Sequence, residues 1–219
     1  VLLLFSSNAE LQKEFIHFLC FRDSLSLEAI IQKSFEDESQ KSLLYNSQAL
    51  KYLEKAAEYG HYESIFVLSQ IYNNFLNDYK KTAKYLKMAA DKGDVESMVD
   101  YGIMLFNGER IPLNIEEGLK YIKMAIDKGN ARAMYNYGNV LMDGKNVQQD
   151  INKSIEYFKT SSDLGYLKST LALATIHYFG YGIDVNKEEA VKYYKIAADK
   201  GDDVAQFNYA YMLENGEGT

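Results

Sequence analysis

Several residue types are scarce in this 219-residue chain, and each shortage excludes a class of protein. One proline is too few for a loop-rich β-sandwich, so the composition favours a chain that is mostly helix. The single cysteine, Cys20, rules out an intrachain disulfide and a thiolate zinc cluster. It also favours a reducing compartment, and we therefore expect a cytoplasmic protein. No apolar run approaches the roughly 18 residues that a membrane span requires, so we expect no membrane insertion.

Positive charge is also in short supply. The net charge is −7 and the sequence pI is about 5.1, whereas a protein that binds a phosphate backbone needs clustered Lys and Arg. The composition therefore argues against a nucleic-acid partner, and the 19 tyrosines are expected to be core and groove-wall residues rather than a stacking platform for bases.

The few histidines offer little material for catalysis or metal binding. His17 and Cys20 could share one helix face, but two ligands do not make a metal site, and we expect a core thiol beside an imidazole. His61 is expected at the surface, and His177 is expected to be a packing histidine with its hydrogen bonds satisfied. Ser169 and His177 are about 12 Å apart along a helix, whereas a nucleophile and its base need to lie within about 3 Å. We therefore expect no catalytic residue, cofactor or metal in these residues, and no enzyme activity.

The chain contains an internal repeat. Similar segments such as MAADKG, MAIDKG and IAADKG end at glycines that are separated by 33, 36, 36 and 36 residues: Gly60, Gly93, Gly129, Gly165 and Gly201. Such regular spacing indicates a solenoid of stacked units. The 33-residue interval is shortened only between Phe75 and Asp78, in an inter-helix loop, where a solenoid tolerates a deletion.

Each repeat divides into two predicted helices. The first helix follows the glycine and carries a small residue near its start, at Ser64, Ser97, Ala133, Ser169 and Ala205. Small or large apolar residues recur four, five and eight positions later, which places them on one helix face. The second helix is capped at its start by Asp78, Asn114, Asp150 or Asn186 and ends at the glycine of the repeat. Small pairs such as Ala89-Ala90 on second helices are expected to pack against the small residues of first helices.

This pattern resembles the Sel-one-like repeat, a relative of the tetratricopeptide repeat, and residues 166–201 match it best. The resemblance implies an all-α fold, an α-α superhelix in which antiparallel helical hairpins form a right-handed solenoid. Residues 46–219 are expected to hold about five repeats, the last one incomplete. Gly118, Ser154 and Thr82 replace the usual alanine early in the second helix, and these departures are expected to weaken individual contacts.

The resemblance also implies that the first helices line a concave groove. Counted from the small residue, positions 2, 3, 6 and 10 face away from the core, and they carry aromatic, aliphatic, Asn and Asp residues with no Lys or Arg. Asn can bond both groups of a peptide backbone, and aromatic rings supply contact area. The apolar residues of this face could instead pack against the neighbouring repeat. The residues expected to bind a partner are Phe66, Asp100, Tyr135, Asn136, Asn139, Thr175, Phe207, Asn208 and Tyr211.

The two ends of the chain carry further expectations. Residues 1–45 do not fit the repeat and are interpreted as two helices that form either a divergent cap or the end of a preceding domain. The absence of an initiator Met suggests a fragment of a longer protein. Since no second helix follows residues 202–215, either further repeats or end-to-end self-association is expected to cover Tyr209, Ala210 and Leu213.

The favoured function is a scaffold or adaptor for protein–protein interaction, in which the groove binds a peptide or helix of a partner protein. Asp100 and Asp143 suggest that this partner is basic. One alternative is a regulatory arm of a multidomain enzyme whose catalytic domain lies outside these residues. Another is a binder of glycans or small ligands that uses the aromatic residues of the groove.

Overall fold

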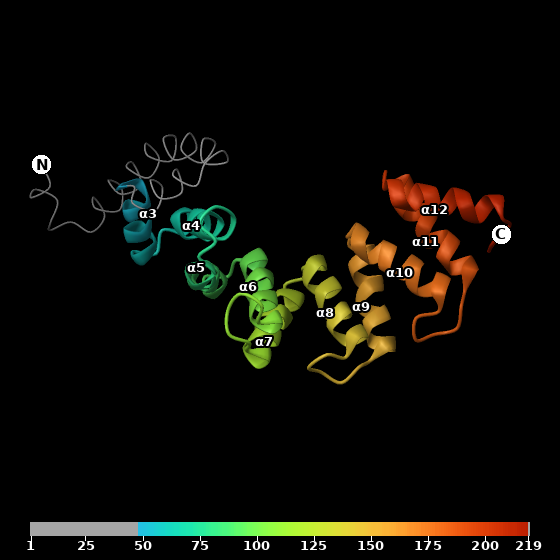
Figure 1. Cartoon of the computed structure of the whole chain (residues 1–219), viewed down its shortest axis with the longest axis horizontal. Coiled ribbons are helices and arrows are strands. Elements are labelled where there is room, and N and C mark those ends of the chain that lie inside the picture. The colour runs from blue at the N-terminus through green and yellow to red at the C-terminus, as the bar shows by residue number, and fades with distance from the viewer. Residues whose placement is uncertain (1–47, 219) are drawn as a thin grey trace, which may run out of the picture. The chain divides into compact units, whose positions relative to one another are not determined.

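The computed structural model describes residues 48–218, and this part of the chain forms ten α-helices and no strand (Figure 1). The predicted all-α fold is therefore confirmed. First and second helices alternate as the repeat predicts. The second helices are α3 (Gln48–Glu58), α5 (Tyr79–Asp91), α7 (Ile115–Asp127), α9 (Ile151–Asp163) and α11 (Lys187–Asp199). The first helices are α4 (Tyr62–Asn74), α6 (Val95–Asn107), α8 (Ala131–Asp143), α10 (Leu167–Phe179) and α12 (Asp203–Glu214).

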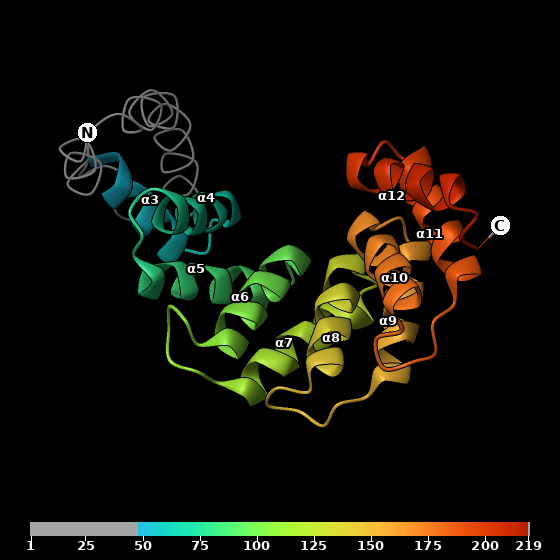
Figure 2. The ribbon, with the colours of Figure 1, turned by 45° about the vertical axis from the view of Figure 1, so that its right-hand side comes forward.

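The chain divides into two compact units, with the boundary after Gly118 within α7. In unit 1, α3 packs against α4, α4 against α5, and α5 against α6. In unit 2, the helices from α8 to α12 pack in the same consecutive way, as the ribbon of Figure 2 shows. Each hairpin thus covers the apolar face of its neighbours inside a unit, which is the source of stability in a repeat array.

Local signals end and begin the helices as predicted. All five repeat glycines adopt a positive φ, for example 84° at Gly60 and 88° at Gly201, so they can take the left-handed conformation that closes a second helix. The side chains of Asp78, Asp150 and Asn186 accept the backbone N–H three residues on, and Asn114 accepts that of Glu117. The predicted caps are therefore confirmed.

The first helices have caps that the sequence analysis missed. Asp94, Asn130 and Asp202, each one residue after a repeat glycine, accept the backbone N–H of the small residue three positions later. His61 does the same for Ser64 through its Nδ1 atom at 3.3 Å. His61 is partly exposed, and its imidazole also caps α4, a role that the sequence did not indicate.

The predicted stripe of small residues is the innermost part of the core. Ser64, Ser97, Ala133, Ser169 and Ala205 are all buried, as are the alanines at positions 56, 57, 89, 90, 125 and 197. Two of the departures from alanine in the second helices make specific contacts of their own. Ser154 is fully buried and donates a 2.7 Å hydrogen bond to the carbonyl oxygen of Gly138. At Gly118 a Cβ atom would lie 2.8 Å from the carbonyl oxygen of Gly102, so the missing side chain permits a closer approach of α7 and α6.

A chain of buried hydroxyls joins three helices of unit 2. Ser169 of α10 donates to the Oγ of Ser161 on α9 at 2.6 Å, and Ser161 donates to the carbonyl oxygen of Ala131 at 2.7 Å. Ser161 and Ser169 are both fully buried. A second pair, Ser162 and Thr170, lies alongside at 2.6 Å. Hydrogen bonds therefore replace part of the alanine packing seen in the other repeats.

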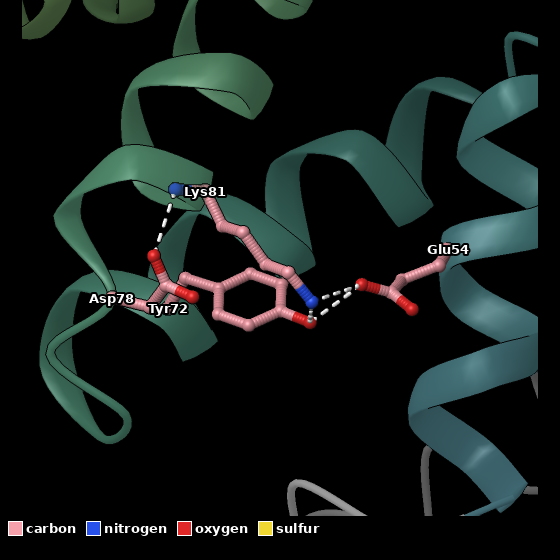
Figure 3. A network of polar contacts seen from close by, with 4 residues as sticks. All are labelled: Glu54, Tyr72, Asp78 and Lys81. Atoms are coloured by element: carbon pink, nitrogen blue, oxygen red, sulfur yellow. Dashed lines mark hydrogen bonds and ion pairs between the residues drawn. The ribbon is translucent and has the colours of Figure 1, made fainter.

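A polar network joins three helices of unit 1 (Figure 3). The hydroxyl of the fully buried Tyr72 donates to Oε1 of Glu54 at 2.6 Å, and Nζ of Lys81 donates to the same oxygen at 2.9 Å. Burial acts to raise the pKa of Glu54, but the hydrogen bonds from Tyr72 and Lys81 and the nearby positive charges outweigh it, so the pKa lies below its usual value. The network holds α3, α4 and α5 together.

Candidate functional site

The face of the first helices contains a pocket in unit 1. Its volume is about 380 Å³, and the side chains of α4 and α6 form its walls. Leu86 of α5 forms part of its floor, and Glu109 and Arg110 reach it from the loop after α6. The lining is mostly polar and includes Ser69, Gln70, Asn73, Thr82, Asp100 and Asn107, together with the apolar Ile103 and Met104.

Unit 2 contains a second pocket, with a volume of about 330 Å³, between α8 and α10. Phe158 of α9 lies beneath it, and this side chain is 1% exposed. Both volumes are at the lower end of the range of protein ligand pockets, about 300–1,000 Å³. The lining residues are Tyr135, Asn139, Met142, Phe158, Lys168, Leu171, Ala172, Thr175 and Ile176.

The two pockets occupy the same place in the repeat. Gln70 and Asn139 both lie six positions after the small residue of their helix, and Leu86 and Phe158 both lie seven positions before a repeat glycine. On the following first helix the lining residues pair in the same way, Asp100 with Ala172, Ile103 with Thr175, and Met104 with Ile176. Each pocket is therefore formed by one first helix, the second helix after it, and the next first helix.

The two pockets lie at equivalent places in the repeat, but the chemistry of their lining residues differs. Acids and amides dominate the pocket of unit 1, whereas the pocket of unit 2 is mainly apolar, with one cation, Lys168, and the polar groups of Tyr135, Asn139 and Thr175. Such a combination of an apolar surface and a few polar groups can bury a side chain and orient it.

A family sequence model matches the chain in the same repeat register. The sequence model of the Sel1 repeat matches residues 46–61, 76–94, 95–130, 131–166, 168–202 and 203–219, which is most of the chain. The chain belongs to the Sel1 repeat family. Sel1 repeats generally serve as protein–protein interaction modules on a non-catalytic scaffold fold.

Solved structures of Sel1 repeat proteins share the fold. A protective antigen of uropathogenic Escherichia coli strains that displays this repeat fold is 24% identical, with a TM-score of 0.70 over 88% of this chain. A Sel1 repeat protein of Oxalobacter formigenes is 23% identical, with a TM-score of 0.64 over 75% of this chain. The chain spans 45% of the length of the first of these proteins and 69% of the second. No curated protein matches the chain in sequence.

The predicted partner-binding residues fall into two groups in this Sel1 repeat array. Asp100 lines the pocket of unit 1, and Tyr135, Asn139 and Thr175 line the pocket of unit 2. The other five line neither pocket: Phe66, Asn136, Phe207, Asn208 and Tyr211.

Several of these residues are less suited to binding than the sequence indicated. The side-chain amide of Asn136 donates a 2.8 Å hydrogen bond to the carbonyl oxygen of Arg132 on its own helix. Tyr135 packs its ring against Phe158 and Tyr166, with centroid distances of 5.7 and 5.3 Å. Asn139 differs, because its amide has no hydrogen bond to any residue that the structure describes. It is therefore the predicted residue best placed to bond a partner.

The residues that complete the pockets were not predicted from the sequence. Leu86 and Phe158 lie on second helices, and only packing brings them into the pocket linings. Arg110 and Lys168 supply positive charge at the pockets, so the expectation of a groove without Lys or Arg is wrong there. Lys168 lies one position before the small residue Ser169, where the helical period places it on the same face as positions 3, 6 and 10.

His177 is not the satisfied packing histidine that the sequence predicted. Neither ring nitrogen has a hydrogen-bond partner among the described residues, and the ring stacks on Tyr193 with a centroid distance of 5.8 Å. Burial lowers the pKa of His177, and Lys159 lowers it further, against the raising effect of Glu189. Ser169, which the sequence had already excluded as its catalytic partner, donates its hydroxyl to Ser161.

The described residues contain neither a metal-binding cluster nor a membrane-spanning helix. No group of three or more His, Cys, Asp or Glu side chains within residues 48–218 is arranged to hold a metal ion. No helix in the same range is long and apolar enough to cross a membrane. His17 and Cys20 lie outside the described residues.

Proposed function

We propose that this Sel1 repeat array is a scaffold that binds a peptide or helix of a partner protein along the face of its first helices. The observation that carries the proposal is the recurrence of a pocket at the same place in two repeats, lined in both cases by first-helix positions that the sequence had marked as a groove. Each pocket can receive one side chain of a bound peptide or helix.

Asn139 provides the sharpest test of this function. It lines the pocket of unit 2, it is half-buried, and its amide is not used within the described structure. Asn139→Ala therefore removes a binding group while leaving the packing of α8 unchanged. Asn152→Ala is a matched control, because Asn152 is exposed on the second helix α9 and lines neither pocket.

The experiment selects binders from a displayed library of random dodecapeptides on the intact chain and measures their affinity by fluorescence polarisation. One to two lost hydrogen bonds correspond to about 1–3 kcal/mol, so we expect Asn139→Ala to weaken the selected peptides by at least about fivefold. Asn152→Ala should leave affinity unchanged, and both variants should melt within a few degrees of the parent. Peptides that bind both variants as tightly as the parent would refute the proposed groove.

A further inference from the structure

The pocket of unit 2 combines an apolar interior with one exposed cation. Phe158 and Ile176 are buried beneath the pocket, and Met142, Leu171 and Ala172 add further apolar surface. An aliphatic or aromatic side chain of a partner that enters this pocket loses contact with water, and each buried CH₂ group contributes about 0.8 kcal/mol.

Lys168 gives the pocket its charge preference. Its side chain is exposed, and no carboxylate among the described residues pairs with it. No acidic side chain lines this pocket, in contrast to the pocket of unit 1, which Asp100 and Glu109 line. A carboxylate beside the inserted side chain would therefore form an ion pair with Lys168, and no negative charge in the pocket lining would repel it.

The position of Lys168 on its helix shows that this charge differs between the repeats. One position before the small residue, the first helices of unit 1 carry Glu63 and Glu96, whereas α8 and α10 of unit 2 carry Arg132 and Lys168. This position is therefore negative in α4 and α6, positive in α8 and α10, and neutral in α12, which carries Val204.

We infer that the pocket of unit 2 binds a large apolar side chain of a partner protein that stands next to an acidic residue in the partner's sequence. This inference rests on the proposed function, and it replaces the expectation of a basic partner for this unit of the array. The apolar side chain fills the space above Phe158, and the adjacent carboxylate pairs with Lys168. The amide of Asn139 bonds the backbone of the same segment.

Methionine methyl groups make the two pockets separately visible. Met142 lines the pocket of unit 2 and Met104 lines that of unit 1. The chain has seven methionines in all, so ¹³C-methyl-methionine labelling gives a simple NMR spectrum of the intact protein. Four synthetic nonapeptides of Gly and Ser, with Leu-Asp, Leu-Lys, Leu-Asn or Ser-Asp at the centre, serve as probes.

We expect the Leu-Asp peptide to shift the Met142 methyl resonance and to bind more tightly than the other three. Lys168→Glu should weaken Leu-Asp binding about three- to tenfold, the range expected for losing an exposed ion pair and adding a repulsion. Glu is tolerated in the first turn of a helix, so this variant should fold normally. Lys153→Glu, an exposed change of the same charge on α9, should have no effect.

The outcomes separate this inference from the proposed function. Tighter binding of the Leu-Lys peptide, or unchanged Leu-Asp binding by Lys168→Glu, would overturn the inference and leave the groove intact. So would a shift of Met104 without a shift of Met142. If no methyl resonance responds to any of the four peptides, the inference is overturned, and the groove itself is then judged by the displayed-library selection.

Discussion

The hydroxyl chain of unit 2 predicts unequal effects for two serines that look equivalent in the sequence. Ser161 and Ser169 are both fully buried. Ser161 stands where other second helices carry alanine, and Ser169 is the small residue of its own first helix. However, Ser169 donates to Ser161, and Ser161 donates to the carbonyl oxygen of Ala131. Removal of Ser161 therefore leaves a buried donor without its acceptor, whereas removal of Ser169 leaves every remaining donor satisfied.

The magnitudes follow from this difference. A buried donor without a partner costs about 1–3 kcal/mol, and replacing serine by alanine inside a helix returns up to about 0.5 kcal/mol. We expect Ser161→Ala to lower the free energy of unfolding by about 1–2 kcal/mol. Ser169→Ala should change it by less than about 0.5 kcal/mol. The double variant should be more stable than Ser161→Ala alone, because the orphaned hydroxyl is then absent.

Urea unfolding followed by far-UV circular dichroism and tyrosine fluorescence measures these differences, since the chain has no tryptophan. A repeat array can unfold in parts, so amide hydrogen exchange of α9 and α10 should be measured as well. The reasoning is refuted if Ser169→Ala costs as much as Ser161→Ala, or if the two effects simply add in the double variant.

Two further predictions concern pH. His177→Leu removes a ring whose nitrogens have no partner among the described residues, so it should stabilise the protein by about 1 kcal/mol at pH 7. Because the folded pKa of His177 is lowered, the parent loses stability as the pH falls below about 6.5, and the advantage of His177→Leu should grow between pH 7 and pH 5 in thermal melts. A constant difference between parent and variant across this range would contradict the prediction. Glu54 also has a lowered folded pKa, so its contribution is present above about pH 4.3 and is lost as the pH falls through the folded value. Glu54→Gln should therefore be less stable than the parent at pH 7 and should lose less stability between pH 5 and pH 3, as measured by chemical denaturation at each pH. An equal loss in parent and variant would exclude this role of Glu54.

Much of the fold was predictable because helix ends depend on neighbours in the chain. A glycine just past a helix and an Asp or Asn at its start act within one turn, so Gly201 and Asn186 could be assigned from the sequence. The cap at His61 was not predictable in this way, because histidine is an uncommon cap and only the contact with Ser64 shows that role.

The candidate site was predictable in part. The helical period places Asn139 and Thr175 on one face, and the structure brings both to one pocket. The period could not show that the amide of Asn136, only three positions from Asn139, bonds a carbonyl oxygen of its own helix. Nor could it show that Val99, which lies two positions after the small residue Ser97 and so on the outward-facing pattern, is fully buried. Those outcomes depend on rotamers and on the packing of the neighbouring repeat.

The sequence alone determined the repeat, its register, the helix boundaries and the small residues that let the helices approach, because each of these depends on short-range spacing. Only the tertiary structure decided which pockets form on the surface of those helices and which charges line them. Phe158 and Lys168 meet in one pocket although they belong to different helices, and Leu86 lies in the equivalent pocket with acidic neighbours instead. The physical reason is that a pocket is formed by side chains from three packed helices, and their combined shape and charge exist only after the helices have packed.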